Sequence, residues 1–185
     1  MDYYFTSDSH FNHSKIIEYS TRPFKTGEEM NEALISNWNN VVKNGDIVYH
    51  LGDFGFTSGK GDIVKDIKSI LSRLNGSINL ILGNHDCQNY NERVLKLFCS
   101  HTLLRDKTIN GQRIIMCHYA MRTWPGQHKG SWQLYGHSHN NLPDDPNSFS
   151  IDVGVDCHNY TPINFERVME IMSKKTYKPV ETHRN

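Results

Sequence analysis

The first half of the chain alternates between strand and helix patterns, and this alternation is what most constrains the fold. Three short apolar runs, at 2–7, 47–51 and 78–82, predict strands. Between them, apolar residues recur at helical spacing over 27–43 and 62–74. Thr26 is placed to cap the first helix, with Glu29 as its capping-box partner. Strands that alternate with helices in this way predict a parallel sheet covered by helices.

The second half is richer in strand patterns. The runs 101–109 and 112–118, separated by Asn110-Gly111, predict a hairpin. Two further strands are expected at 131–137 and 150–155, and a last helix at 163–173. We therefore expect an α/β protein, a four-layer α/β/β/α sandwich of two mixed β-sheets flanked by helices. The length of 185 residues predicts one domain over 1–185.

Composition excludes several classes of partner. The formal net charge is zero, which removes a general attraction to nucleic acid or to a membrane surface. We expect neither a signal peptide nor a transmembrane helix, because no long uncharged apolar run is present. The four cysteines form no C-x-x-C pair, and we expect reduced thiols in a cytoplasmic protein. The eleven histidines are unusual and suggest a metal site.

Five short polar motifs follow five of the expected strands. Each alone has an ordinary explanation as a solvated strand end, a turn or a core histidine. Loops at the carboxyl ends of strands in α/β sheets converge on one edge, so the five motifs are expected to meet. If the chain stays in regular β conformation, His137 and His139 lie on one face, and so do Asp8 and His10. The motifs are Asp8-Ser9-His10, Gly52-Asp53, the run from Gly83 to Asp86, His118, and the run from Gly136 to His139.

In order and residue type, these motifs resemble the calcineurin-like metallophosphoesterase family. The resemblance runs from Asp8 to His139, and the phrases HFNHSKII, VYHLGDF and GSWQLYGHSHN resemble small bacterial and phage-encoded members without a cap domain. It implies the metallophosphoesterase fold and two divalent ions. Imidazole, carboxylate and amide donors suit Mn²⁺, our first expectation, and also Fe, Ni²⁺ or Zn²⁺. One ion would be held by Asp8, His10, Asp53 and His139, and the other by Asp53, Asn84, His118 and His137, with Asp53 shared.

Such a set suits phosphate-ester hydrolysis. Two divalent ions outweigh the charges of Asp8 and Asp53, so a bridging water would be a hydroxide near neutral pH, ready for in-line attack. By the resemblance, His85 would protonate the leaving group without binding metal, and Asp86 would orient it. We expect hydrolysis of a phosphodiester, or else a phosphomonoester, of a small nucleotide or a nucleic-acid end. The alternative is a catalytically silent protein-binding scaffold of the same fold, which should have lost ligands or the acid.

Weaker candidates surround these motifs. His13, Arg22 and Arg122 are possible substrate contacts, each with an ordinary surface role as its alternative. A monoester carries one more negative charge than a diester and would need such arginines to point into the site. Between the fourth and fifth motifs, aromatic residues either stack on a base or simply pack. We expect no extended nucleic-acid tract and no membrane partner, and the sequence carries no signal of oligomeric state. The aromatic residues considered between the fourth and fifth motifs are Tyr119, Trp124 and His128.

Overall fold

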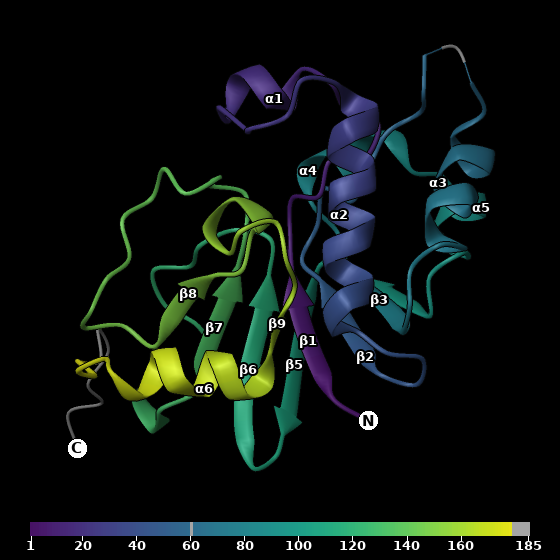
Figure 1. The fold of residues 1–185 in the computed structure, drawn as a ribbon. Coiled ribbons are helices and arrows are strands. Elements are labelled where there is room, and N and C mark those ends of the chain that lie inside the picture. Colours follow the sequence, from purple (N-terminus) through teal and green to yellow (C-terminus); the bar gives the residue numbers. More distant parts are fainter. Residues whose placement is uncertain (60, 179–185) are drawn as a thin grey trace.

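The computed structural model describes residues 1–59 and 61–178, and it contains two mixed β-sheets flanked by helices (Figure 1). The expected fold class is confirmed. The first sheet has the strand order β4-β3-β2-β1-β9 and the second the order β5-β6-β7-β8. The first contains β1 (Tyr3–Thr6), β2 (Ile47–His50), β3 (Ser77–Ile81), β4 (Ser100–Thr102) and β9 (Ile163–Asn164). The second contains β5 (Leu104–Ile109), β6 (Gln112–Cys117), β7 (Trp132–Tyr135) and β8 (Ser150–Asp152).

Helices α2 and α3 lie on one side of the first sheet (Figure 1), and their apolar faces are buried against it. Trp38 of α2 and Ile67 of α3 belong to the same buried cluster as Val48 of β2. The α-helices are α1 (Ile16–Tyr19), α2 (Gly27–Val41), α3 (Ile63–Leu71), α4 (Asn84–Asn89), α5 (Glu92–Leu95) and α6 (Phe165–Ser173). Within the described residues, the 3₁₀-helices are η1 (Gln127–Lys129) and η2 (Val155–Cys157).

The start of α2 only half matches its prediction. The Thr26 hydroxyl accepts a hydrogen bond from the Glu29 backbone N–H at 3.1 Å, as an N-cap should. The Glu29 carboxylate, however, accepts from the backbone N–H of Lys25 at 2.8 Å instead of from Thr26. The expected reciprocal capping box is therefore not formed, because the carboxylate reaches one residue further back.

The second core lies between the two sheets. Successive strand residues point to opposite faces, so Tyr4 joins the cluster under the helices while Phe5 joins the cluster between the sheets. Met116 of β6 and Leu134 of β7 belong to this second cluster. Helix α6 contributes Phe165, whose ring stacks on Trp132 with centroids 5.9 Å apart. Both sheets are thus fixed relative to each other, which matters because the polar motifs lie on both.

One expected element is wrong. The run 101–109 was expected to be a single strand of a hairpin, but it divides at Leu103 into β4 and β5, which belong to different sheets. β4 pairs in parallel with β3, whereas β5 pairs antiparallel with β6 as expected. The expected helix at 163–173 likewise begins with two strand residues, β9, paired antiparallel with β1. Local pattern could not show these partners, because pairing with a distant strand decides them.

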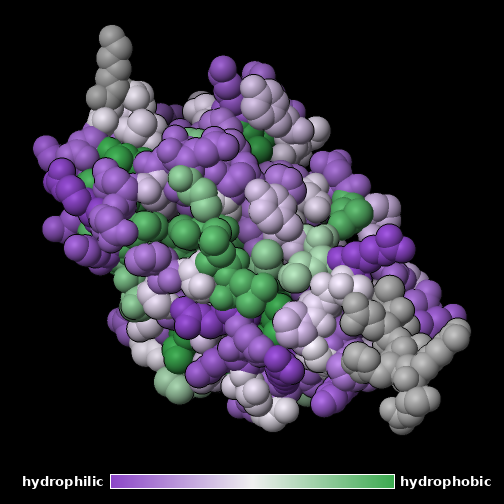
Figure 2. Space-filling view, turned by 180° about the vertical axis from the view of Figure 1, so that it is seen from behind, coloured by the Kyte–Doolittle hydropathy of each residue, from purple (hydrophilic) through white to green (hydrophobic). Residues whose placement is uncertain are grey.

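The described residues contain no helix that is long and apolar enough to cross a membrane. All four cysteines are free. The predicted single domain over 1–185 stays a prediction, because 179–185 lie outside the described residues. On the face opposite to that of Figure 1, hydrophobic residues gather in a band across the middle of the molecule (Figure 2).

Candidate metal centre

The five motifs follow the carboxyl ends of strands from both sheets. Strands β1, β2 and β3 run parallel in the first sheet, and β6 and β7 run parallel in the second. Backbone hydrogen bonds join the loops: the N–H of Asp8 donates to the Gly52 carbonyl at 2.9 Å, and the N–H of His10 donates to the Asp53 carbonyl at 3.0 Å. The Gly136 N–H donates to the His118 carbonyl at 2.9 Å in the same way. The motifs therefore meet, as predicted.

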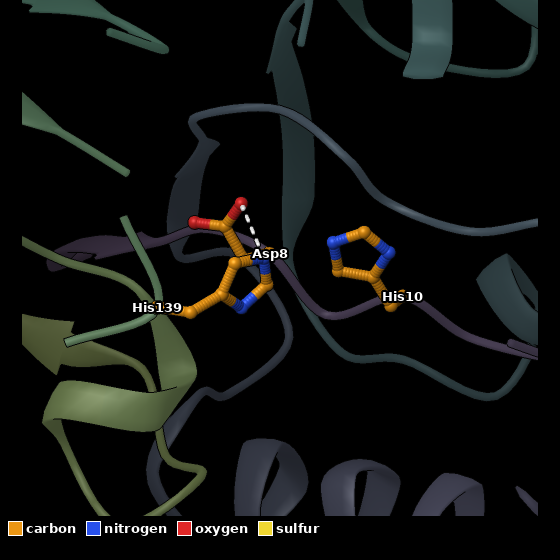
Figure 3. Close-up of side chains that lie close together, drawn as sticks. All are labelled: Asp8, His10 and His139. Atoms are coloured by element: carbon orange, nitrogen blue, oxygen red, sulfur yellow. Dashed lines mark ion pairs between the residues drawn. The ribbon is translucent and has the colours of Figure 1, made fainter. Parts of the chain in front are cut away.

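Two clusters of possible metal ligands result. Asp8, His10 and His139 bring one ligand atom each to within 4.8 Å of one another, and Figure 3 shows their side chains gathered around one space. The His139 Nε2 atom lies 3.9 Å from the Asp8 carboxylate. A second cluster, with the same spacing limit, consists of Asp53, His118 and His137.

Asp53 connects the two clusters. Its Oδ2 atom lies 3.7 Å from His10 Nε2 and 3.5 Å from His118 Nε2, so one carboxylate oxygen faces a histidine of each cluster. The Asn84 Oδ1 atom lies 3.2 Å from His118 Nε2, beside the second cluster. The positions of Asp53 and Asn84 are those that the ligand sets implied by the resemblance require, and metal binding by these residues stays a prediction.

The backbone at the ligands differs from the regular β conformation considered above. Asp8 and His10 have φ angles of 58° and 50°, and His137 and His139 have 70° and 46°. Asp53 has a φ of 56°. These values lie in the left-handed region, which costs a residue other than glycine about 1–3 kcal/mol. The side chains therefore do not alternate as on a strand, and His137 and His139 go to different clusters.

Glycines in two of the motifs allow the close approach of the carboxylates. A Cβ atom on Gly136 would overlap the Ser7 hydroxyl and the Asp8 carboxylate. A Cβ atom on Gly83 would overlap the Asp53 carboxylate in the same way. Gly83 and Gly136 are therefore required by contact with the Asp53 and Asp8 carboxylates, in addition to any turn preference.

The polar atoms of the first cluster fit a cation. Asp8 Oδ1 and His10 Nε2 are buried and have no hydrogen-bond partner. Burial raises the pKa of Asp8 to about 7, although His118 and His139 act to lower it. Burial also holds the pKa of His10 well below its ordinary value, so its imidazole is neutral and can act as a ligand. Buried polar atoms of this kind need a partner, and a divalent ion would supply it to both.

His85 lies beside both clusters. It is half-buried, its backbone N–H donates to Asp53 Oδ1 at 3.0 Å, and its ring centroid is 5.6 Å from that of His10. Neither cluster includes it. Its role as proton donor stays a prediction that this placement permits.

Asp86 was expected to orient the His85 ring, but its carboxylate bonds backbone groups instead. Its buried carboxylate accepts from three backbone N–H groups: Asp53 at 2.7 Å, Gly83 at 2.9 Å and Phe54 at 3.1 Å. Burial raises its pKa to about 6 against the pull of these bonds. Asp86 thus fixes the loop that carries Asp53.

Arg22 has neither of the two roles considered for it, a substrate contact or an ordinary surface arginine. Its guanidinium is fully buried and donates to both carboxylate oxygens of Asp156, each at 2.8 Å. It also donates to the carbonyls of Asp8 at 2.7 Å and Ser9 at 3.1 Å, and to the sulfur of Met30. All of its N–H donors are used within the protein, so it does not clamp a substrate phosphate in this arrangement.

Asp156 is a functional candidate that the sequence analysis missed. Its Oδ2 atom lies 2.8 Å from His139 Nδ1, which directs His139 Nε2 toward Asp8. Carboxylates that bond the outer nitrogen of a metal-binding histidine fix its tautomer and raise its basicity. A polar residue after the run 150–155 was a usable signal, because the same rule identified the other motifs. In the second cluster, the Leu51 carbonyl takes this role for His118 Nδ1 at 2.7 Å.

The weaker candidates differ in where they lie. His13 is half-buried at the first cluster, with its Nδ1 atom 3.3 Å from His10 Nδ1 and its ring 4.5 Å from that of Phe56. Arg122 is exposed. Trp124 is 5% exposed and donates to the Ser131 carbonyl, so it packs and offers no open face.

The fold and the two clusters define an α/β protein whose strand ends carry two His/Asp clusters consistent with a dinuclear metal site. Residues 1–151 match the family model of the calcineurin-like phosphoesterase superfamily domain. The chain belongs to this superfamily, and the resemblance that the motifs indicated is confirmed.

Curated relatives and a solved structure agree with this membership. The chain is 37% identical to the uncharacterized protein MJ1445 of Methanocaldococcus jannaschii over 176 residues, 92% of this chain and 91% of that protein. It is 37% identical to the gene 66 protein of Mycobacterium phage L5 over 83 residues, 45% of this chain and 39% of that protein. The protein of unknown function AQ665 from Aquifex aeolicus has the same fold, with a TM-score of 0.68, 22% identity, and coverage of 92% of this chain and 98% of that chain.

Proposed function

We propose that the chain is a dinuclear-metal-dependent phosphodiesterase that hydrolyses a small nucleotide ester or a nucleic-acid end. The observation that carries the proposal is the place of Asp53, whose Oδ2 atom faces His10 of one cluster and His118 of the other. A carboxylate between two ligand clusters is the arrangement that holds two ions close enough to act on one phosphoryl group. We expect Mn²⁺ at both positions, with Fe, Ni²⁺ or Zn²⁺ as substitutes.

The chain's own residues have separate roles in this proposal. Asp8 and Asp53 supply negative charge to the two positions, and the histidines would supply imidazole nitrogens as donors. When bound, the two ions supply Lewis acidity and an acidified water for in-line displacement. His85, outside both clusters but next to Asp53, would donate a proton to the leaving oxygen. Asp86 keeps the Asp53 loop in place through its three backbone hydrogen bonds.

The diester preference is supported by Arg22. A monoester would bring a second negative charge and would gain from a free arginine at the site. Arg22 points inward, but its donors are used by Asp156, Asp8 and Ser9. Arg122 is exposed on the loop that follows Tyr119. The charge available for a phosphate therefore comes mainly from the two ions, which suits a monoanionic diester.

The test is hydrolysis of bis-(p-nitrophenyl) phosphate and of p-nitrophenyl phosphate by the metal-free protein with Mn²⁺, Ni²⁺ or Zn²⁺ added. We expect turnover that requires a divalent ion, with a higher kcat/KM for the diester. Faster hydrolysis of the monoester would overturn the diester preference alone. The absence of turnover with every ion and both esters would contradict the proposed function and favour the catalytically silent scaffold.

A further inference from the structure

Tyr119 forms an exposed aromatic wall beside the second cluster. It follows His118 directly at the end of β6 and is 46% exposed. Its ring centroid lies 5.1 Å from that of His118 and 4.8 Å from that of His137, at interplanar angles of 73° and 66°. The ring therefore stands edge-on or nearly so to two of the expected metal ligands, with much of its surface open to solvent.

The backbone that carries Tyr119 is hydrogen-bonded to a buried side chain of β7. Gln133 of β7 is fully buried, and its side-chain amide N–H donates to the Tyr119 carbonyl at 3.0 Å. The oxygen of the same amide, Gln133 Oε1, accepts a hydrogen bond from the Met121 backbone N–H at 3.3 Å. A buried amide that bonds the loop at two points keeps the backbone that carries the ring in place before a ligand arrives, which reduces the entropy cost of binding.

The first cluster has an aromatic wall of its own. The half-buried Phe56 ring lies 4.5 Å from that of His13 and 5.1 Å from that of His85, measured between centroids. Tyr119 and Phe56 thus stand beside different clusters, while the inward-pointing Arg22 is used within the protein. Such surroundings suit an ester that carries one charge and a planar ring.

We propose that Tyr119 is the stacking platform for the base of a nucleoside phosphodiester, so that the substrate class of this site is a nucleoside ester. The proposal rests on the proposed function, because it uses the same site. Nucleosides are the common alcohol components of phosphate esters that present a flat aromatic face. Stacking of a base on an aromatic side chain is sequence-tolerant, so no particular base is required.

The experiment compares two diesters with the same leaving group: thymidine 5′-(p-nitrophenyl phosphate) and methyl p-nitrophenyl phosphate, both with Mn²⁺. Loss of one stacked base corresponds to about a 5- to 150-fold change. We expect Tyr119→Ala to lower kcat/KM for the thymidine ester by about this factor, mainly through a higher KM. The kcat/KM for the methyl ester should stay within about twofold of the wild-type value. Tyr119→Phe should keep the wild-type preference, because the ring face remains.

Leu104→Ala is the matched control. Leu104 is exposed and lies opposite Cys117 in the β5–β6 ladder, so the substitution removes nearby apolar surface but no ring. Leu104→Ala should leave kcat/KM unchanged for both esters. Equal losses for both esters in Tyr119→Ala, or no loss for either, would overturn the platform.

A binding measurement separates this proposal from the proposed function. If the wild-type protein hydrolyses neither ester, the proposed function fails, and calorimetric titration with thymidine 5′-monophosphate and Mn²⁺ still tests the platform. Binding that weakens by the same factor in Tyr119→Ala supports the platform. Equal affinity of the wild-type and variant proteins, or no binding to the wild type, contradicts it.

Discussion

The replacement Asp156→Asn tests how the first cluster is held together. Asp156 joins His139 to Arg22 through three contacts of 2.8 Å, and the side chains of Arg22 and Asp156 are 0% and 5% exposed. Asparagine has nearly the same shape but no charge, and it offers one acceptor oxygen in place of two, so it cannot accept all three hydrogen bonds. The buried guanidinium of Arg22 then lacks its counter-charge, and the negative charge behind His139 Nδ1 is lost.

Two magnitudes follow from these contacts. Breaking a buried ion pair by removing one charge costs about 3–5 kcal/mol of stability. Loss of a carboxylate behind a metal-binding histidine weakens metal binding about 10- to 100-fold. We therefore expect Asp156→Asn to unfold at a lower urea concentration and to bind Mn²⁺ more weakly. The contacts to the carbonyls of Asp8 and Ser9 suggest that the loss extends to the turn that carries Asp8.

The assay is urea unfolding of the metal-free protein together with calorimetric titration of Mn²⁺. Asp106→Asn is the control, since it breaks the exposed pair with Arg113, whose two side chains are 40% and 45% exposed. An exposed pair contributes about 0–1 kcal/mol, and this one lies outside both clusters. Wild-type affinity for Mn²⁺ in a folded Asp156→Asn protein would refute the role assigned to Asp156.

Three further predictions concern the site directly. His85→Ala should keep its metal content while kcat falls about 10²- to 10⁴-fold, and a parallel loss of metal measured by elemental analysis would make His85 a ligand. Asp8→Asn and His10→Ala should each weaken Mn²⁺ binding and stop hydrolysis, and full activity in either variant would remove that residue from the ligand set. Gly136→Ala should lower both the unfolding midpoint and the affinity for Mn²⁺, because its Cβ atom would overlap the Asp8 carboxylate; unchanged values would show that the turn can shift without cost.

Much of the architecture was predictable because local patterns and the fold agree. The apolar periodicities over 27–43 and 62–74 correspond to α2 and α3, and the apolar runs that follow them, 47–51 and 78–82, correspond to β2 and β3. The rule that loops at strand ends converge was enough to bring the polar motifs together. The rule did not depend on the exact strand boundaries, which differ from the expected ones by one to three residues in most elements.

The missed features depend on contacts between distant parts of the chain. The division of 101–109 at Leu103 arises because β4 pairs with β3 and β5 pairs with β6. Asp86 was expected to orient its neighbour in sequence, but it bonds the backbone of the Asp53 loop, 32 and 33 positions away. Arg22 was considered as a substrate contact or as a surface arginine, and neither reading describes its buried role, because a loop arginine is indistinguishable in sequence from a buried one.

The sequence by itself determined the α/β class, the family and the chemical identity of the candidate ligands, since donor types and their order after strands are written locally. Only the tertiary structure decided how the residues divide the work. It placed Asp53 between the clusters, joined Arg22 to Asp156 over 134 positions, and set Tyr119 on Gln133 beside His118. The physical reason is that each of these roles is a contact between segments that meet only when the two sheets pack together.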